Sequence, residues 1–426
     1  MRDFARSDNA AVQAQLDRLA QLSVPDGRLG LDTIRALLDR LGNPHRKLPP
    51  VFHVAGTNGK GSTCAFLRAM LEAEGYKVHV TTSPHLVRYN ERIRVAGKLI
   101  SADRLAELLT EVLDIGEDLN PSFFEVTIAA AFTEFARVPA DACVVEVGLG
   151  GRFDATNVLE PDVLAACGIA ALGIDHERFL LAPEEGVPTI PIARIAFEKA
   201  GIAKAGVPLI TLEGSHVPEA ERVIEDVAHA VGAPLHKVPA FSNGSIDIDA
   251  DGYPAPGLGG EHQEKNAALA NGMMRYQSRL AISEESIRKG IGSARWPARM
   301  QRLGRGPLTS LKERQDVWLD GGHNPSAGLA IARAFPGPLH LVLGMLENKD
   351  PRSLLDPLGD RIRSLTIVPI PGHEAHKREA FGNTARTAGD VKEALSGVPA
   401  DGYPVLIAGS LYLAGEVLRL NGELPD

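Results

Sequence analysis

The stretch that decides the fold reads Gly56-Thr57-Asn58-Gly59-Lys60-Gly61-Ser62-Thr63. It follows VFHVA at residues 51–55, an apolar run that predicts a short buried strand, and we expect a helix over residues 64–75. Glycines allow the backbone to curl so that successive N–H groups point at phosphate oxygens. A strand, a glycine loop, a lysine and a helix in this order therefore predict a nucleotide-binding loop.

The loop differs from the usual phosphate-binding pattern GxxxxGK[ST]. Only Thr57 and Asn58 separate its first two glycines, and another glycine follows Lys60. We expect Lys60 to lie near the β- and γ-phosphates of a nucleotide. Ser62 or Thr63 is expected to open the helix, where the helix dipole favours anions. A simple glycine turn between a strand and a helix is the alternative interpretation.

Strands and helices alternate on both sides of this loop. Two helical segments are expected before it, at residues 10–22 and 31–41. Further strands are expected after it, at residues 77–81, 142–147 and 163–167. Such alternation is typical of a parallel sheet with helices on both faces. We therefore predict an α/β fold built on a phosphate-loop-type, mostly parallel sheet.

A second α/β pattern begins after the sequence WPAR at residues 296–299. Five further elements are expected there, namely strands at 316–319, 340–343, 365–368 and 405–408 and a helix at 326–334. We predict an N-terminal ATPase domain at residues 1–298, a hinge at 299–307 and a smaller, Rossmann-like C-terminal α/β domain at 308–426. The Gly- and Pro-rich residues 232–260 are expected to be irregular.

The composition predicts a globular protein without a polyanionic partner. Of the 426 residues, 44% are hydrophobic and 23% are charged, which suits roughly two or three ordinary domains. The formal net charge of -9 argues against nucleic acid as a partner. Neither a membrane-spanning apolar run nor a signal-peptide pattern is found, so no membrane association is expected. The sparse cysteines fit a reducing compartment, and we expect a cytoplasmic protein.

Polar residues follow several predicted strands, at the edge of a parallel sheet where ligands gather. Glu146 lies late in a valine-rich strand, where a buried carboxylate is costly unless it is paired or bound to a metal. Ser83 and His85 follow one neighbouring strand, and Asp175 and His176 follow another. Each of them alone is most simply a loop residue, but their convergence predicts a metal site.

Together these motifs resemble folylpolyglutamate and dihydrofolate synthases, a family of the muramyl-peptide (Mur) ligase superfamily. The resemblance covers roughly residues 29–411 and rests on the phosphate loop and on five more motifs: SPHL at 83–86, EVGLGGRFDATN at 146–157, DH at 175–176, EKAGI at 198–202 and DGGHNP at 320–325. It implies an ATP-dependent carboxylate–amine ligase that adds L-glutamate to dihydropteroate or to the glutamate tail of reduced folates. The reaction passes through an acyl phosphate and gives ADP and phosphate, and the family is usually monomeric.

By position, the resemblance also implies which residues form the site. The catalytic residues are Lys60, Lys199 and His323. The nucleotide-binding residues are Asn58, Gly59, Lys60, Gly61, Ser62, Asn266, Arg299 and Asp320. The ligands of the first magnesium ion are Ser83, Glu146 and His176. The pterin or folate pocket takes Leu29, Gly30, Ser122, Phe123, Phe124, Glu125, Phe153, Asp154 and Ala155.

For the nucleotide and pterin contacts, the residue types give a chemical reason for the assignment, and each also has a simpler structural explanation. An asparagine such as Asn266 can read an adenine edge through its paired donor and acceptor. A phenylalanine such as Phe123 or Phe124 can stack on a flat heterocycle, and Asp154 can accept hydrogen bonds from its donors. Without the resemblance, Asn266 would be a cap or surface residue and the phenylalanines would be core residues.

Lys199 matches a lysine that carries a carbamate, formed from carbon dioxide, in this family. The modification replaces a cation with oxygen ligands for a second magnesium ion, so the resemblance implies two Mg²⁺ ions with ATP as co-substrate. An ordinary helix lysine paired with Glu198 is the alternative. The chain is longer than usual between His176 and Ile195, and we expect residues 177–194 to form a lid or to alter substrate access.

Two other functions fit parts of the sequence. A muramyl-peptide-type ligase acting on another carboxylate shares the mechanism, but it normally carries a full domain before the loop, for which we expect no space here. A non-catalytic phosphate-loop nucleotide-binding protein would need neither the second domain with Asp320 and His323 nor the helix of Lys199. Dihydrofolate synthase activity, folylpolyglutamate synthase activity and both together are all compatible with the motifs.

Overall fold

The chain forms two compact units, each of them an α/β structure. The computed structural model describes residues 7–22, 30–240, 253–382 and 384–426. The larger unit takes the described residues up to 257 and residues 263–295, and the smaller unit takes 258–262 and 296–426. The predicted α/β class with mostly parallel sheets is confirmed in both units, whereas the domain limits predicted from the sequence stay a prediction.

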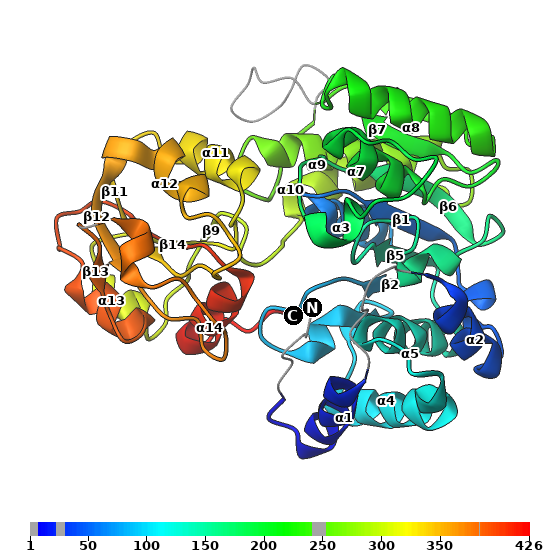
Figure 1. Ribbon diagram of the computed structural model, residues 1–426, viewed down its shortest axis with the longest axis horizontal. Helices are drawn as coiled ribbons and strands as arrows, with labels where there is room; N and C mark the ends of the chain where they lie inside the picture. The colour runs from blue at the N-terminus through cyan, green and yellow to red at the C-terminus, as the bar shows by residue number, and fades with distance from the viewer. Residues whose placement is uncertain (1–6, 23–29, 241–252, 383) are drawn as a thin grey trace. The chain divides into compact units, whose positions relative to one another are not determined.

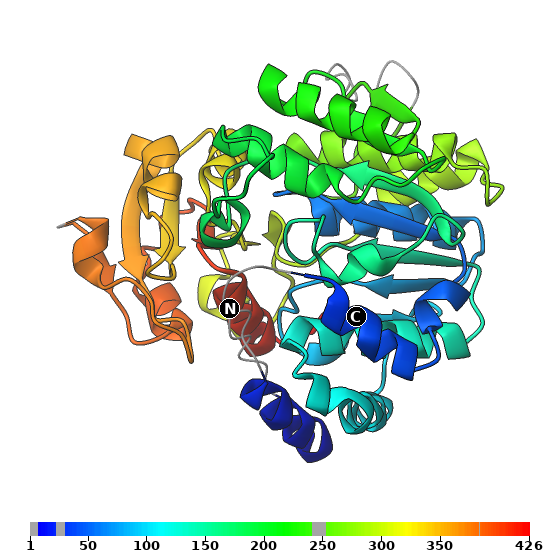
Figure 2. The ribbon, with the colours of Figure 1, turned by 45° about the vertical axis from the view of Figure 1, so that its right-hand side comes forward.

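The larger unit is built on a sheet whose strand order, in the described part of the chain, is β4-β3-β2-β5-β1-β6-β7-β8 (Figure 1). The strands are β1 (Val51–Ala55), β2 (Val78–Thr81), β3 (Ile93–Val95), β4 (Lys98–Leu99), β5 (Ala142–Glu146), β6 (Leu164–Ile169), β7 (Leu209–Leu212) and β8 (Leu235–Val238). The pairs β2–β3 and β3–β4 are antiparallel, and the other pairs are parallel. In Figure 2 the blue strand β1 lies inside this sheet.

The connections between these strands are mostly helical. The α-helices are α1 (Ala10–Gln21), α2 (Asp32–Arg40), α3 (Lys60–Ala73), α4 (Ala102–Gly116), α5 (Phe123–Arg137), α6 (Glu177–Leu180), α7 (Pro191–Ala200), α8 (Pro218–Val231), α9 (His262–Tyr276) and α10 (Glu284–Ser293). Short 3-10 turns lie at η1 (Pro44–Lys47), η2 (Tyr89–Arg92), η3 (Glu117–Leu119) and η4 (Ala155–Val158). The two helical segments predicted before the loop are confirmed as α1 and α2.

Apolar side chains cover both faces of this sheet, which explains why β1 is buried along its whole length. Successive residues of a strand point to opposite faces. Cys143 and Val145 belong to a core cluster with apolar residues of α4 and α5. On the backbone of β6, a Cβ atom at Gly168 would overlap Met273 of α9, and one at Gly290 of α10 would lie 2.5 Å from the backbone of Met70 in α3. Close helix packing therefore fixes both glycines.

The structure corrects two predicted boundaries. Helix α3 begins at Lys60 rather than at residue 64, because Gly59 adopts a left-handed backbone (φ 85°) that ends the loop directly before the lysine. Residues 232–260, predicted to be irregular, contain the edge strand β8 (Leu235–Val238). Gly232 ends α8 in a left-handed cap, so the chain can return at once and pair with β7. Residues 241–252 of this range lie outside the described part.

The smaller unit has its own sheet, in the order β13-β12-β11-β14-β10-β9 among the described residues. Its strands are β9 (Gln301–Arg302), β10 (Val317–Asp320), β11 (Leu339–Leu343), β12 (Ile362–Ile367), β13 (Arg386–Thr387) and β14 (Val405–Ala408). Its α-helices are α11 (Pro325–Ala334), α12 (Arg352–Leu358), α13 (Val391–Gly397) and α14 (Leu411–Asn421), with 3-10 turns at η5 (Thr309–Lys312), η6 (Gly359–Arg361) and η7 (Arg378–Phe381). Only β9 is antiparallel to its neighbour, so this second mostly parallel sheet is confirmed.

The three cysteines of the chain all lie in the core of the larger unit. Cys64 in α3, Cys143 in β5 and Cys167 in β6 are buried free thiols. Burial raises the pKa of each thiol above its usual value. Among the helices of the described residues, none has both the length and the apolar composition that a membrane span needs.

Candidate active site

The phosphate loop packs so closely against its neighbours that two of its glycines have no room for a side chain. A Cβ atom on Gly56, which has φ 148°, would lie 2.8 Å from Ala170 Cβ. One on Gly59 would overlap the amide oxygen of Asn266. Asn58 N–H donates to the Ala171 carbonyl at 3.1 Å, which ties the loop to the residues after β6. Helix α3 then starts, and its first N–H groups, which have no partner within the helix, lie at the loop.

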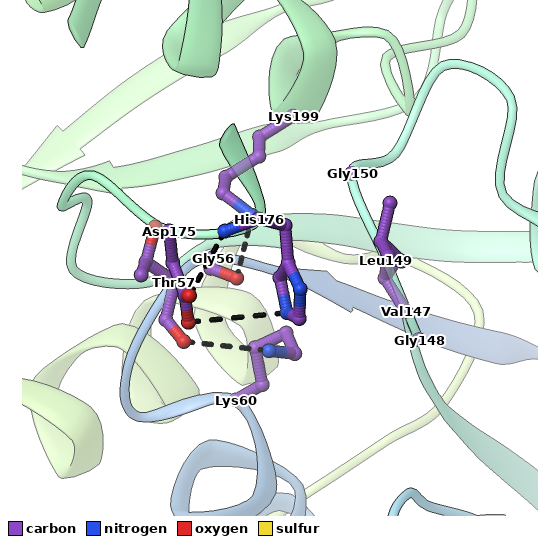
Figure 3. Close-up of a pocket in the computed structure, with 10 residues that line it drawn as sticks. All are labelled: Gly56, Thr57, Lys60, Val147, Gly148, Leu149, Gly150, Asp175, His176 and Lys199. Atoms are coloured by element: carbon purple, nitrogen blue, oxygen red, sulfur yellow. Dashed lines mark hydrogen bonds and ion pairs between the residues drawn. The ribbon is translucent and has the colours of Figure 1, made fainter. Parts of the chain in front are cut away.

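Two lysine amines come together beside this loop (Figure 3). Lys199 Nζ donates to the Gly56 carbonyl at 2.9 Å, and Lys60 Nζ donates to the Thr57 carbonyl at 3.5 Å. Burial is the largest of the influences that together lower the pKa of Lys199 to about 7, and the charge of Lys60 acts in the same direction. A pocket lined by two amines and by a glycine loop attracts anions.

Asp175 and His176 line the same pocket, and in Figure 3 they face the glycine turn at residues 147–150. His176 has a left-handed backbone (φ 53°), and its N–H donates to Asp175 Oδ1 at 2.9 Å. The ring Nε2 lies 3.8 Å from Asp175 Oδ2. Figure 3 shows that His176, Lys60 and Lys199 reach into one space from separate segments of the chain.

Glu146 is the last residue of β5 and is almost fully buried. Its Oε2 accepts a hydrogen bond from the backbone N–H of Ser83 at 3.0 Å, so two predicted metal ligands lie together at neighbouring strand ends. The glycine turn that follows Glu146 lines the pocket at residues 147–150. A Cβ atom on Gly148 would overlap the ring of Phe124, which places that ring against the turn.

Helix α7 carries Lys199 and packs against the end of this glycine turn without a gap. A Cβ atom on Gly151 would lie 2.6 Å from the Glu198 carbonyl and 3.0 Å from Lys199 Cα. The N–H of Arg152 donates to the same Glu198 carbonyl at 2.7 Å. The position of Lys199 is therefore fixed by the turn and by the helix together.

Several residues predicted for the pterin pocket make contacts that stabilise the local fold. Ser122 caps α5, and Ser122 and Glu125 form a reciprocal capping box in which the Ser122 N–H donates to Glu125 Oε2 at 2.7 Å. Phe123 packs edge-on against Tyr89 at 5.7 Å between ring centroids. Phe153 lies under the guanidinium of Arg152, whose Cζ is 4.2 Å from the ring centroid. Gly30 is exposed, and Leu29 lies outside the described residues.

Asp154 lies at the centre of a buried hydrogen-bonded array and is followed by the buried Ala155. Its Oδ2 accepts from the N–H of Leu149 at 2.8 Å, and its Oδ1 accepts from the Thr156 hydroxyl at 2.5 Å. His53 Nε2 lies 2.8 Å from that hydroxyl and donates to it, because the hydroxyl proton is used on Asp154. Burial raises the pKa of Asp154 and lowers the pKa of His53 to about 3.

The remaining predicted nucleotide contacts fall into two groups. Asn266 belongs to the larger unit, where it is buried and donates to Gln263 Oε1 at 2.9 Å. Asp320, Arg299 and His323 belong to the smaller unit. The Asp320 carboxylate accepts two backbone hydrogen bonds. Oδ2 accepts from the Met300 N–H at 2.8 Å, and Oδ1 accepts from the Gly322 N–H at 2.7 Å. It thereby holds the turn of Arg299 and the turn of His323.

The chemistry of the donor set fits Mg²⁺ held jointly with a nucleotide. Glu146 and Asp175 offer carboxylate oxygens, Ser83 a hydroxyl and His176 a ring nitrogen, close to the phosphate loop. Among the described residues, no three His, Cys, Asp or Glu side chains are grouped as a metal cage. Mg²⁺ is commonly bound by one or two carboxylates, by waters and by phosphate oxygens rather than by a cage of protein ligands.

The sequence did not reveal several residues that build the site. Thr57 lines the pocket, although no individual role was predicted for it. His262 feels the charges of both Asp320 and Arg299, and burial lowers its pKa. Arg152 and Glu184 form ion pairs beside Lys199. No local pattern marks such partners, because each contact joins residues far apart in the chain.

Known proteins resemble the chain over nearly its whole length. No family model matches it. Dihydrofolate synthetase of Saccharomyces cerevisiae is 31% identical over 93% of this chain and 98% of its own. Dihydrofolate synthase/folylpolyglutamate synthase of Escherichia coli is 34% identical over 92% of this chain and 91% of its own. The crystal structure of the bifunctional folylpolyglutamate synthase/dihydrofolate synthase with Mn, AMPPNP and L-glutamate bound has a TM-score of 0.80 at 29% identity, covering 96% of this chain and 97% of that one.

Proposed function

The chain belongs to the folylpolyglutamate synthase and dihydrofolate synthase family, and on that premise we propose that it joins L-glutamate to dihydropteroate, to the glutamate tail of reduced folates, or to both. It is an ATP-dependent carboxylate–amine ligase. The relatives favour this function over a muramyl-peptide ligase and over a non-catalytic nucleotide-binding protein. The geometry that best supports the proposal is the pocket in which Lys60, Lys199 and His176 meet beside the phosphate loop.

The phosphate loop is proposed to hold the β- and γ-phosphates of ATP. The central loop residues, Asn58, Gly59, Lys60, Gly61 and Ser62, surround the N-terminus of α3, where backbone N–H groups and the helix dipole favour anions. Lys60 adds a charge that follows the γ-phosphoryl group during transfer. Phosphoryl transfer depends on such positioning and charge stabilisation rather than on a protein nucleophile.

The reaction then consists of two balanced substitutions. A substrate carboxylate oxygen attacks the γ-phosphorus and the bond to the β-phosphate oxygen breaks, which gives an acyl phosphate and ADP. The glutamate amine attacks the acyl carbon, loses a proton and expels phosphate, which leaves the amide. In both steps the protein positions the reactants. The glycine turn at 147–150 and the phosphate loop would bind them through backbone groups, which are less mobile than side chains.

Ser83, Glu146 and His176 are proposed to hold one Mg²⁺ ion, and Lys199, as a carbamate, a second. When bound, the ions neutralise phosphate charge as the γ-phosphoryl group is transferred. Glu146 is oriented for this by the Ser83 N–H, which fixes one carboxylate oxygen at the strand end. His176 is oriented by Asp175 and by its own left-handed backbone.

Carbamate formation at Lys199 is supported by the basicity of its amine. Only a neutral amine attacks carbon dioxide, forming the N–C bond and releasing one proton. Since burial lowers the pKa of Lys199 to about 7, a substantial neutral fraction exists at neutral pH. The test is ¹³C NMR in ¹³C-bicarbonate at pH 8: a carbamate signal should appear in the wild type and vanish in Lys199→Ala. An identical spectrum for both proteins would show that Lys199 is not carbamylated.

The pterin ring is proposed to lie near the glycine turn. Phe124 packs on Gly148 of that turn, and Asp154 holds the turn through the Leu149 N–H. Phe123, Phe153 and Ala155 would complete the apolar wall, and Ser122 and Glu125 fix the start of α5 from which Phe123 and Phe124 project. For the nucleotide, Asn266, Arg299 and Asp320 remain proposed contacts, with His323 as a catalytic group. A cytoplasmic location and a monomeric state also remain predictions.

The deciding experiment is ATP-dependent phosphate release with magnesium and L-glutamate, comparing dihydropteroate, tetrahydrofolate and no pterin. Release with dihydropteroate alone identifies a dihydrofolate synthase, and release with tetrahydrofolate alone a tail-extending synthase. Release with both identifies a bifunctional enzyme. Phosphate release that is independent of any pterin would contradict the proposed function.

A further inference from the structure

The long connection between His176 and α7 is anchored by one acidic side chain. Residues 177–190 form the short helix α6 and then an irregular stretch, and α7 starts with Pro191. Of the two neighbouring glutamates in this stretch, Glu185 is exposed, whereas the Glu184 side chain is only 17% exposed. Glu184 points inward because two arginines receive it.

Glu184 belongs to a set of four ion pairs. Arg152 donates to both of its oxygens, from Nη1 to Oε1 at 3.1 Å and from Nη2 to Oε2 at 2.6 Å. Arg194 Nη2 donates to Oε2 at 2.8 Å. The same two arginines bind Glu198, through Arg152 Nη2 at 2.8 Å and Arg194 Nη2 at 3.0 Å. Two arginines and two glutamates share their charges, so the set is neutral as a whole.

Because these ion pairs are buried, loss of one partner costs more stability than it does in a surface pair. The side chains of Arg194 and Glu198 are 7% and 6% exposed. By contrast, the surface pair of Arg137 and Glu111 is 44% and 33% exposed, and such pairs contribute little to stability. Removal of one member of a desolvated set leaves a buried charge without its partner. Glu184 therefore cannot be lost without a rearrangement of the arginines.

The set is linked at both ends to the candidate active site. Arg152 directly follows the glycine turn, and its N–H binds the carbonyl of Glu198. The next residue, Lys199, donates to the phosphate loop at Gly56. At its other end, the segment starts at His176, and Leu180 of α6 would lie 3.0 Å from a Cβ atom on Gly150.

We propose that Glu184 is a positioning residue for the phosphate and metal pocket: through Arg152 and Arg194 it fixes the 177–190 segment against the glycine turn and α7, and so sets the places of His176 and Lys199. Glu184 is not among the residues that line the pocket, so we assign it an indirect effect, carried by Arg152 and Arg194. The segment thus serves as a fixed strap rather than as a lid. This inference rests on the proposed function, since it assumes that the pocket receives magnesium and a nucleotide.

The test compares Glu184→Gln, which keeps the shape but loses the charge, with the matched control Glu185→Gln. Magnesium–ADP binding is measured by calorimetry at 20 °C, and KM for ATP, pterin substrate and glutamate by phosphate release. Partners that orient ligand-binding groups typically cost about 10–100-fold on loss, so Glu184→Gln should weaken magnesium–ADP binding about tenfold. KM for ATP should rise similarly, while KM for the pterin substrate and for glutamate stays within about twofold.

Two further variants and an independent readout separate positioning from stability. Glu184→Asp keeps the negative charge and should recover part of the magnesium–ADP affinity. Arg194→Lys keeps the positive charge but loses the branched guanidinium, so it should weaken magnesium–ADP binding as Glu184→Gln does. Hydrogen exchange of amides 177–190 in the protein without nucleotide should be faster in Glu184→Gln than in Glu185→Gln. Arg194→Lys keeps the test decisive if Glu184→Gln does not fold.

Two outcomes would overturn the inference: magnesium–ADP affinity equal to that of Glu185→Gln, or a lower melting temperature with unchanged affinity at 20 °C. A wild-type protein that binds no magnesium–ADP would remove the proposed function, and this inference with it. Equal affinities in the variants, with tight binding by the wild type, would remove the inference alone.

Discussion

Two strands, one in each compact unit, end in an acidic residue followed by a glycine turn, yet the two carboxylates are used differently. Glu146 at the end of β5 accepts from the N–H of Ser83, which belongs to a neighbouring strand end. Asp320 at the end of β10 accepts from Met300 and Gly322, which form the turns around it. Glu146 lies next to a pocket with two lysines, whereas Asp320, a proposed nucleotide contact, holds the backbone at Met300 and at Gly322. The two carboxylates thus differ in their hydrogen-bond partners, although their residue type and their place on the strand are alike.

The largest effect is expected at the lysine proposed to contact the phosphates of ATP. Lys60→Ala should reduce turnover about 100- to 1000-fold, because loss of one preorganised group that stabilises developing charge has a cost of that order. The melting temperature should hardly change, since Lys60 is partly exposed and its amine makes one long hydrogen bond, to the Thr57 carbonyl, within the described part of the chain. Steady-state phosphate release measures it, with the exposed Lys289→Ala as the control. Wild-type turnover in Lys60→Ala would remove the phosphate-loop assignment.

The Glu146 side of the comparison is tested by removing one charge. Glu146→Gln should raise the magnesium concentration for half-maximal activity about 10–100-fold, because a charged oxygen ligand becomes neutral. Its remaining amide oxygen still accepts from Ser83, so the unfolding midpoint should stay close to that of the wild type. A magnesium titration at saturating ATP gives the answer. An unchanged titration would place Glu146 in the same class as Asp320.

The Asp320 side should respond mainly in stability. Asp320→Asn turns one acceptor into a donor that faces a backbone N–H, and an unsatisfied buried group costs about 1–3 kcal/mol. We expect the unfolding free energy of the smaller unit to fall by this amount, with an unchanged magnesium requirement. Denaturant unfolding and the magnesium titration are compared for the same protein. A shifted magnesium requirement with unchanged stability would reverse the assignment.

The smallest effect concerns pH and the buried array behind the glycine turn. The pKa of His53 is about 3 in the folded chain, below its unfolded value of about 6.5. Well above pH 6.5 its contribution to stability is complete; as the pH falls through 6.5 toward 3, only the unfolded chain gains a proton. Between pH 6.5 and 5, this proton should lower the free energy of unfolding by about 1.6 kcal/mol.

His53→Gln should flatten this pH dependence, because its amide can donate to Thr156 without titrating. Urea unfolding at pH 6.5 and pH 5 measures the difference, and the exposed His229→Gln serves as the control. An equal loss on acidification in the wild type and in His53→Gln would show that other groups carry the effect.

The sequence predicted the features that depend on local pattern. The strand predicted at residues 51–55 is confirmed as β1, because an apolar run acts within a few residues, whereas nucleotide binding by the loop after it stays a prediction. The α/β class follows from alternation along the whole chain. The capping box of Ser122 and Glu125 was also readable as S-x-x-E before an apolar run, although these residues were assigned only to the pterin pocket.

Features that depend on distant contacts could not be predicted in this way. Gly59 must be glycine because Asn266, far along the chain, fills the space of its side chain. Glu184 is unremarkable in sequence, and only the fold brings Arg152 to it. The edge strand β8 was missed because its four residues follow Gly232 and Pro234, which normally mark irregular chain.

The burial of Cys64, Cys143 and Cys167 gives the chain an internal reporter. All three thiols of the sequence lie in the larger unit, and each is screened from solvent by the sheet and its helices. A thiol reagent added to the native protein can react only after that unit opens. The labelling rate therefore measures the opening of one unit in a two-unit chain without any engineered probe. Protection gained on adding nucleotide would report, through mass action, how strongly the ligand holds that unit closed.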